Sequence, residues 1–106
     1  MYRESEVRRG IVLLDEKLPD WRIRFDPGNL DMSRCSTCVL GQVFGSYGEG
    51  LVALGVNYEQ APVYGFDLPN IPSNSTEWEF SMAQYREFGN TWRNLTNPPR
   101  SDLVRI

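Results

Sequence analysis

Two cysteines separated by two residues form the pattern in this sequence with the clearest chemical potential. Cys35 and Cys38 make a C-x-x-C motif at the predicted start of a helix, where free backbone amides and the helix dipole favour a thiolate. This arrangement suits redox chemistry or metal binding. A thioredoxin-like oxidoreductase needs a βαβ context, however, and the residues before Cys35 supply only a short predicted hairpin.

A zinc site would need more ligands than the two cysteines provide. Structural zinc takes four ligands, generally Cys or His, and the sequence has no histidine and no third cysteine. Carboxylates such as Asp31, or a second copy of the chain, would have to complete the site. The structural alternative is that Cys38, followed by Val39 and Leu40, is a small buried hydrophobic residue and Cys35 begins the helix.

Other catalytic patterns are weak or missing. The absence of histidine excludes Ser-His and Cys-His nucleophile pairs. The glycines of residues 41–50 lack the Gly-Lys-Ser/Thr ending of a P-loop and do not follow a predicted strand. Four carboxylates capable of acid-base work, Asp15, Glu16, Glu77 and Glu79, lie on predicted solvated helix faces. We therefore expect no enzymatic activity and no cofactor, with metal or thiol chemistry at Cys35 and Cys38 as the alternative.

The distribution of charge argues against two classes of partner. The 106 residues carry a net charge of -3. The acidic surplus lies in residues 31–70, which contain four carboxylates and a single basic residue, Arg34. Nucleic acids and anionic membranes both require concentrated basic side chains. No apolar run approaches the roughly 18 residues needed to cross a bilayer, and no signal-peptide pattern follows the polar N-terminus. We expect a cytoplasmic protein that binds neither nucleic acid nor membrane.

The N-terminal third is predicted to contain a helix and a β-hairpin. Residues 5–18 have apolar side chains at helical spacing, with Ser5 as the cap and Pro19 beyond the end. Residues 21–25 alternate apolar and basic side chains, as strands do. Asp26-Pro27-Gly28-Asn29 then matches a type II turn, so a short hairpin to residues 30–32 is expected. The helical stripe consists of Val7, Ile11, Leu14 and Leu18.

The central segment combines helical periodicity with glycines. Gly41, Gly45 and Gly48 fall on one face of a helix over residues 38–55, where they would admit a closely packed partner helix. Alternatively, residues 45–50 form a turn that divides the segment into two shorter helices. Each interior glycine costs about 1 kcal/mol relative to alanine, which favours the broken helix, with Gly55 as its final cap. Residues 56–72 contain many proline and glycine breakers, and a single helical turn near residues 59–64 is expected.

The strongest predicted element is the C-terminal helix. Thr76 and Glu79 form a capping box, Asn97 with the prolines after it ends the helix, and an apolar stripe runs between them. These elements predict an α+β protein that is mainly α, with one domain over residues 1–98 and a loose tail over 99–106. The stripe consists of Trp78, Met82, Tyr85, Phe88, Trp92 and Leu95.

Aromatic residues are numerous for so small a chain, at 12% of its length. Most large aromatic side chains belong to a core, but a core of this size leaves some of them for the surface, where apolar patches mark protein interfaces. The interaction candidates are Tyr64, Phe66, Trp78, Tyr85, Phe88 and Trp92.

The central segment also carries a resemblance. CVLGQVFGSYGEGLVALG (residues 38–55), with LLDEKLPDW before it and Tyr64-Gly65-Phe66 after it, resembles small proteins encoded by actinobacteria and their bacteriophages, a group with no assigned activity. The likeness covers roughly residues 10–66 and extends weakly to Thr91-Trp92-Arg93. It implies a phage or prophage accessory protein in a bacterial cytoplasm. We therefore expect a non-enzymatic interaction module that binds a host or phage protein or a second copy of itself.

Overall fold

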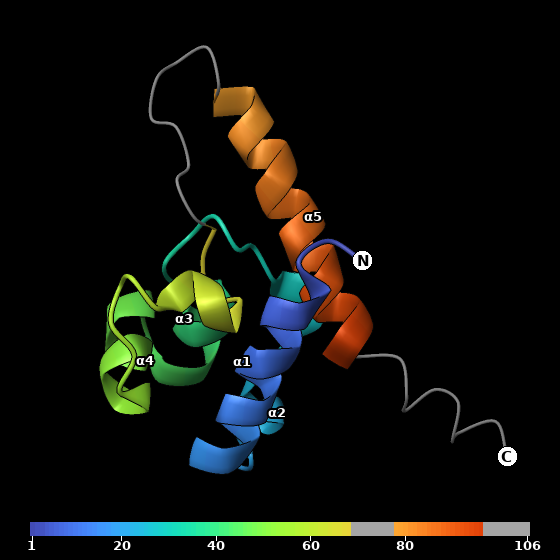
Figure 1. The fold of residues 1–106 in the computed structure, drawn as a ribbon. Coiled ribbons are helices and arrows are strands. Elements are labelled where there is room, and N and C mark those ends of the chain that lie inside the picture. The colour runs from blue at the N-terminus through green and yellow to red at the C-terminus, as the bar shows by residue number, and fades with distance from the viewer. Residues whose placement is uncertain (69–77, 97–106) are drawn as a thin grey trace, which may run out of the picture.

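The computed structural model of the protein describes residues 1–68 and 78–96, and most of these residues are helical (Figure 1). No β-strand occurs in the described ranges, so the predicted α+β class with a short β-hairpin is wrong. The α-helices are α1 (Glu4–Lys17), α2 (Trp21–Arg24), α3 (Val39–Phe44), α4 (Tyr47–Leu54) and α5 (Trp78–Thr96), with 3-10 helices η1 (Pro27–Asn29) and η2 (Ala61–Tyr64).

The predicted first strand is the short helix α2. Trp21 and Phe25 are buried, whereas Ile23 between them is 85% exposed. A spacing of four places Trp21 and Phe25 on one face of a helical turn. The same two residues also fit the alternating pattern of a strand, which is why the sequence suggested one. The predicted type II turn is the 3-10 helix η1, in which the Asp26 side chain accepts a hydrogen bond from the Gly28 amide.

Helix α1 confirms the N-terminal prediction within one residue at each end. It begins at Glu4, and its capping position is Arg3 in a left-handed conformation (φ 52°), so Ser5 is not the cap. Val7, Gly10 and Leu14 form its buried face. Gly10 is a point of very close approach, because a Cβ atom there would collide with the backbone oxygen of Tyr64.

The glycine-rich centre is a broken helix, as the sequence predicted. Helix α3 ends at Gly45 (φ 105°), and the Ser46 hydroxyl caps α4 by accepting from the Glu49 amide. Gly55 (φ 72°) ends α4 in the left-handed conformation. The two helices also pack closely, because a Cβ on Gly50 would lie 2.7 Å from the Cβ of Leu40. Helix break and close packing therefore coexist, at different glycines.

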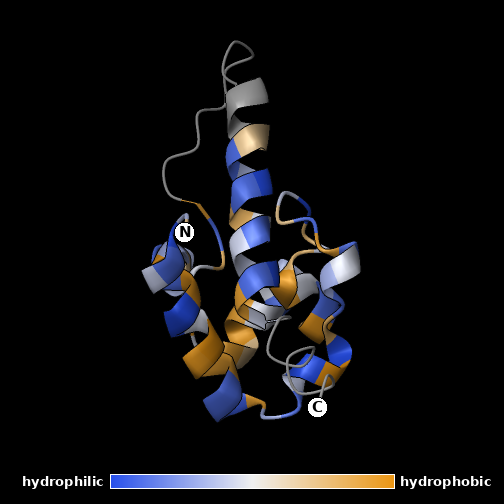
Figure 2. Ribbon diagram, turned by 90° about the vertical axis from the view of Figure 1, so that its right-hand side faces the viewer, coloured by the Kyte–Doolittle hydropathy of each residue, from blue (hydrophilic) through white to orange (hydrophobic). Residues whose placement is uncertain are grey.

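Helix α5 contributes its C-terminal half to an aromatic core. Trp92 is fully buried, its indole Nε1 donates to the Gly65 oxygen at 2.7 Å, and its ring stacks on Phe66 with centroids 6.1 Å apart. Trp21 meets the same indole edge-on, at 6.5 Å between centroids. Hydrophobic segments of several helices gather around this half of α5 (Figure 2). The N-terminal end of α5 extends beyond the body of the molecule (Figure 1).

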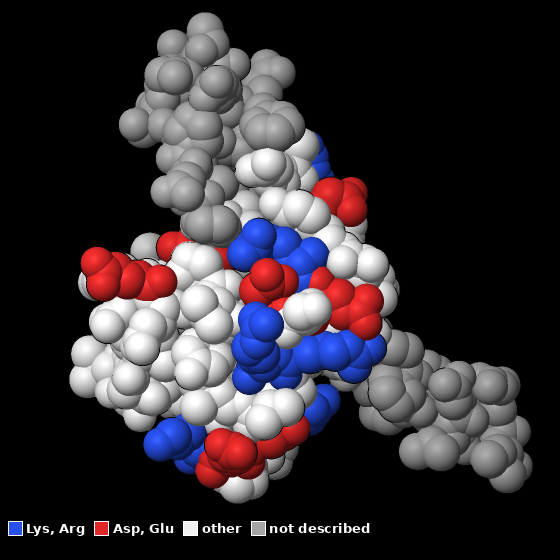
Figure 3. Space-filling view, in the orientation of Figure 1, with Lys and Arg blue, Asp and Glu red and all other residues white. Residues whose placement is uncertain are grey.

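The face of the molecule shown in Figure 3 is mixed in charge over α1 and largely uncharged over α3 and α4. Val52 of α4, Tyr58 and Val63 of η2 are exposed apolar side chains, at 82%, 70% and 47%. Within the described residues, none of the helices has the length and hydrophobicity required to span a bilayer.

Candidate functional site

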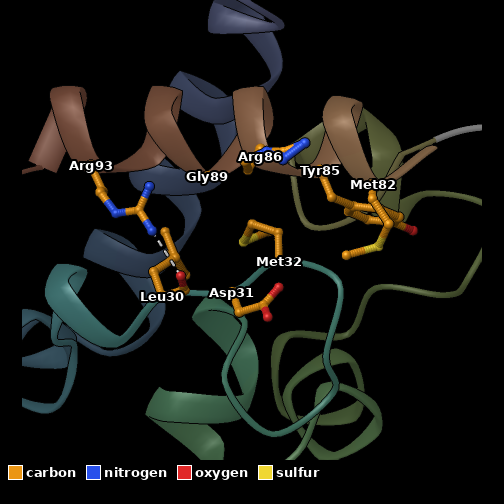
Figure 4. Close-up of a pocket in the computed structure, with 8 residues that line it drawn as sticks. All are labelled: Leu30, Asp31, Met32, Met82, Tyr85, Arg86, Gly89 and Arg93. Atoms are coloured by element: carbon orange, nitrogen blue, oxygen red, sulfur yellow. Dashed lines mark hydrogen bonds between the residues drawn. The ribbon is translucent and has the colours of Figure 1, made fainter. Parts of the chain in front are cut away.

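A groove lies between α5 and the loop that follows η1 (Figure 4). Its volume is about 290 Å³, and we call it the α5 groove. Apolar and thioether side chains from both walls meet across it, with charged side chains around them. The loop contributes Leu30, Asp31 and Met32, and the helix contributes Met82, Tyr85, Arg86, Gly89 and Arg93.

Arg93 fixes the two walls relative to each other. Its Nε donates to the Pro27 oxygen at 3.0 Å, one terminal nitrogen donates to the Leu30 oxygen at 2.8 Å, and the other donates to the Asn90 side chain at 2.8 Å. The Arg93 to Leu30 bond is visible in Figure 4. A charged donor to a backbone oxygen forms a strong hydrogen bond, so the guanidinium holds the loop against α5.

Gly89 provides the open space in the helical wall. A Cβ atom at this position would lie 3.6 Å from Arg93 Nη1, 3.8 Å from Met32 Cγ and 3.9 Å from Leu30 Cδ2, which are ordinary contact distances. The glycine is therefore not required by crowding. Its effect is to leave the groove unfilled between Met32 and α5.

Asp31 borders the groove as a fixed negative charge. Its Oδ1 accepts from the Ser33 hydroxyl at 2.6 Å and from the Ser33 amide at 3.0 Å. The hydrogen bond from the Ser33 hydroxyl, aided by Arg34 and Arg93, holds the pKa of Asp31 below its ordinary value. This carboxylate is ionised at neutral pH.

A second, smaller cavity adjoins the α5 groove and shares Met32 and Tyr85 with it. Its volume is about 130 Å³. We call it the Asp67 pocket, after the carboxylate that organises it. Its other lining residues are Ser33, Arg34, Cys35, Cys38, Tyr47 and Phe66.

Two tyrosines from different helices converge on Asp67. The Tyr47 hydroxyl of α4 donates to Oδ2 at 3.0 Å, and the Tyr85 hydroxyl of α5 donates to Oδ1 at 3.2 Å. The amide of Leu68 also donates to Oδ1, at 2.8 Å. This network joins α4, α5 and the segment after η2, and it points both phenolic protons towards one carboxylate.

The environment of the two tyrosines opposes their ionisation. Burial, and then the charge of Asp67, raise the pKa of Tyr85 to about 12 and raise the pKa of Tyr47 further. Both side chains are therefore neutral hydrogen-bond donors across the physiological range.

Tyrosine titration is expected to show this effect directly. In unfolded chains tyrosine ionises near pH 10, so the stability that these two residues contribute is present below about pH 10 and is lost as pH rises towards 12. Ultraviolet absorbance of the phenolate should show two late-ionising tyrosines in the native protein, and Asp67→Asn should shift both to lower pH. Simultaneous ionisation of all five tyrosines near pH 10 would contradict the network.

The cysteines lie at the start of a helix, where the sequence predicted them, and Cys38 is buried as expected for a small hydrophobic residue. Cys38 caps α3: its Sγ accepts from the Gly41 amide at 3.3 Å, and its thiol points to the Cys35 oxygen at 3.8 Å. Burial raises the pKa of the Cys38 thiol instead of lowering it. Cys35 is exposed, and both cysteines are free. In residues 1–68 and 78–96, no cluster of three or more Cys, Asp or Glu side chains is arranged to hold a metal ion.

The predicted interaction residues separate into core and surface positions. Phe66, Phe88 and Trp92 are at most 2% exposed and belong to the core. Tyr85 is half-buried and lines both cavities. Tyr64 is half-buried beside a shallow cavity of about 300 Å³ on α1. Trp78 begins α5, but its side chain lies outside the described part, as do Thr76 of the predicted capping box and the predicted tail over 99–106.

The structure brings together residues that the sequence did not connect. Phe66, Tyr85 and the two cysteines line one pocket with Tyr47 and Asp67, which sequence reasoning did not select. The acidic surplus of residues 31–70 included Asp67, but no spacing rule linked it to tyrosines 18 and 20 positions away. Comparison with known proteins adds no residue to this site: the chain matches no protein-family model, no curated protein and no solved structure.

Proposed function

We propose that the protein is a non-enzymatic interaction module that binds a segment of a protein partner in the α5 groove. The observation that carries this proposal is the groove itself, an open space of about 290 Å³ walled by Leu30, Met32 and Met82. Methionine side chains are flexible and polarizable, and they adapt to different apolar partners. Asp31 and Arg86 place charges of both signs beside the apolar walls, which can orient an incoming peptide.

The resemblance of the central segment to proteins of actinobacteria and their phages supports a cellular context for this activity. In that context the protein is a phage or prophage accessory factor in a bacterial cytoplasm, and its partner is a host or phage protein. The alternative, metal or thiol chemistry at Cys35 and Cys38, has less support because burial raises the pKa of Cys38.

Filling the groove from Gly89 tests the proposal. Gly89→Leu places an apolar side chain in the open space next to Met32 and replaces a poor helix former, a gain of about 1 kcal/mol in helix propensity. We expect a thermal midpoint equal to or above that of the wild type. Recovery of the partner from host lysate should fall about tenfold or more, because an occupied groove admits no peptide.

The matched control is Ala83→Leu, which adds a similar side chain to an exposed position of the same helix. This variant should recover the partner at the wild-type level. A second copy of the chain could also occupy the groove, and light scattering tests this case. A dimer formed through the groove would dissociate into monomers in Gly89→Leu. A folded Gly89→Leu protein that captures the same partner at wild-type yield would exclude the groove as the binding site.

A further inference from the structure

The polar atoms of the Asp67 pocket act as acceptors. Within the described residues, Oδ1 of Asp67 accepts from Tyr85 and Leu68, whereas Oδ2 accepts from Tyr47 alone. A carboxylate oxygen has two acceptor positions, so Oδ2 retains one. The phenolic hydrogens are already directed at Asp67, which leaves the two phenolic oxygens able to accept but not to donate to a ligand. A ligand at this point must therefore be a hydrogen-bond donor.

The charge of the pocket favours a cation. No lysine or arginine in the described part of the chain lies within ion-pair distance of Asp67. Arg34 lines the same pocket, but its side chain is 73% exposed and its Nε lies 3.8 Å from Asp31 Oδ2. The guanidinium is therefore largely solvated, and water screens its charge. The half-buried carboxylate of Asp67 remains without a cationic partner among these residues.

The walls and size of the pocket select the kind of cation. Met32, Phe66 and the two tyrosines provide apolar surface around the carboxylate, which suits a methylene chain ending in a charged group. A volume of about 130 Å³ equals that of about four water molecules. An ammonium group is compact and has three donors, which matches one carboxylate position and two phenolic oxygens better than the planar five-donor guanidinium does.

We infer that the Asp67 pocket binds the side-chain ammonium group of a lysine in the protein partner. This inference rests on the proposed function and adds a specific anchor beside the α5 groove. Met32 and Tyr85 line both cavities, so a peptide in the groove passes directly beside the pocket. The groove receives an apolar part of the partner, and the pocket receives its lysine.

Butylammonium chloride, a mimic of the lysine side chain, tests the pocket in the absence of any partner. In an NMR titration of the full chain at constant ionic strength, we expect saturable shifts of the Tyr47 and Leu68 amides. Butanol has the same apolar stem without the charge, and it should bind at least about tenfold more weakly. Equal binding of the two probes, or shifts that do not saturate, would overturn the inference. This test needs only the wild-type protein.

Asp67→Asn keeps the shape of the side chain and removes its charge, so it should weaken butylammonium binding by about tenfold or more. Glu59→Gln is the matched control, because it removes one carboxylate from an exposed position, and it should bind like the wild type. Wild-type affinity in a folded Asp67→Asn variant would also overturn the inference. If Asp67→Asn does not fold, the comparison of butylammonium with butanol still decides the outcome.

The partner experiment separates this inference from the proposed function. Acetylation of the partner's lysines should weaken its binding to the wild type but have little further effect on Asp67→Asn, because the two changes remove the same contact. Loss of binding in Gly89→Leu without any effect of acetylation would support the groove and overturn the lysine anchor. An effect of acetylation that depends on Asp67, with full binding in Gly89→Leu, would support the anchor and exclude the groove.

Discussion

Truncation of Trp92 to alanine is expected to lower the free energy of unfolding by about 5 kcal/mol, the upper end of the range for large aromatic residues. The change removes a fully buried indole, its stack on Phe66 and its edge contact with Trp21. It also leaves the buried Gly65 oxygen without its donor. Since small domains are stable by about 5–15 kcal/mol, urea denaturation followed by circular dichroism should show a protein at or near the limit of folding.

Trp92→Phe provides the comparison that separates packing from hydrogen bonding. It retains an aromatic ring against Phe66 but loses the donor to Gly65, so the expected loss is about 1–3 kcal/mol. A Trp92→Ala protein within about 1 kcal/mol of the wild type would contradict the placement of this residue at the centre of the core.

Gly10→Ala is the second substitution with a large expected effect, about 3 kcal/mol of destabilisation. The added methyl group would collide with the backbone oxygen of Tyr64 and would also lie 3.2 Å from the rings of Phe66 and Trp92. A backbone atom cannot move aside as a flexible side chain can, so α1 and η2 must separate. Thermal unfolding and urea titration measure the loss.

Gly48→Ala is the matched control, because it makes the same change within helix α4. The nearest atom to a Cβ at this position is the Tyr58 hydroxyl oxygen at 3.9 Å, an ordinary contact. Alanine is the better helix former, and a gain of about 0.5–1 kcal/mol is expected. If the two variants were equally stable, the close approach of α1 and η2 would be excluded.

Local chemistry predicted most of the helical elements. The apolar stripe of α1, the break of the central helix, the cap at Gly55 and the single turn of η2 were all readable from the sequence, because each depends on spacing or on glycine conformation within a few residues. The break itself is shorter than the predicted turn over residues 45–50, since α4 already begins at Tyr47. The strand prediction failed because Trp21, Ile23 and Phe25 alternate as in a strand, while Trp21 and Phe25 also have the spacing of four that is typical of a helix. Only the fold shows that Ile23 is solvent-exposed while the other two pack on the core.

The candidate site was less predictable than the elements, because it depends on tertiary contacts. Cys38 was expected at a helix start and is found there as the cap of α3. Its burial raises the pKa of its thiol, which agrees with the expectation of a small buried hydrophobic residue and not with the thiol-active alternative. Tyr85 was selected for its place in an apolar stripe. Its hydrogen bond to Asp67 crosses 18 positions and could not be inferred from helical periodicity.

The contacts between the N-terminal segment, residues 1–25, and α5 have a consequence for synthesis of the protein. The Thr91 hydroxyl donates to the Tyr2 oxygen, a partner 89 positions earlier in the chain, and Trp21 needs Trp92 to cover its ring edge. On the ribosome, α1 and α2 therefore emerge long before the residues that complete their core. The nascent chain keeps Trp21 and the buried face of α1 uncovered until α5 leaves the exit tunnel, so the aromatic core cannot form before α5 has emerged.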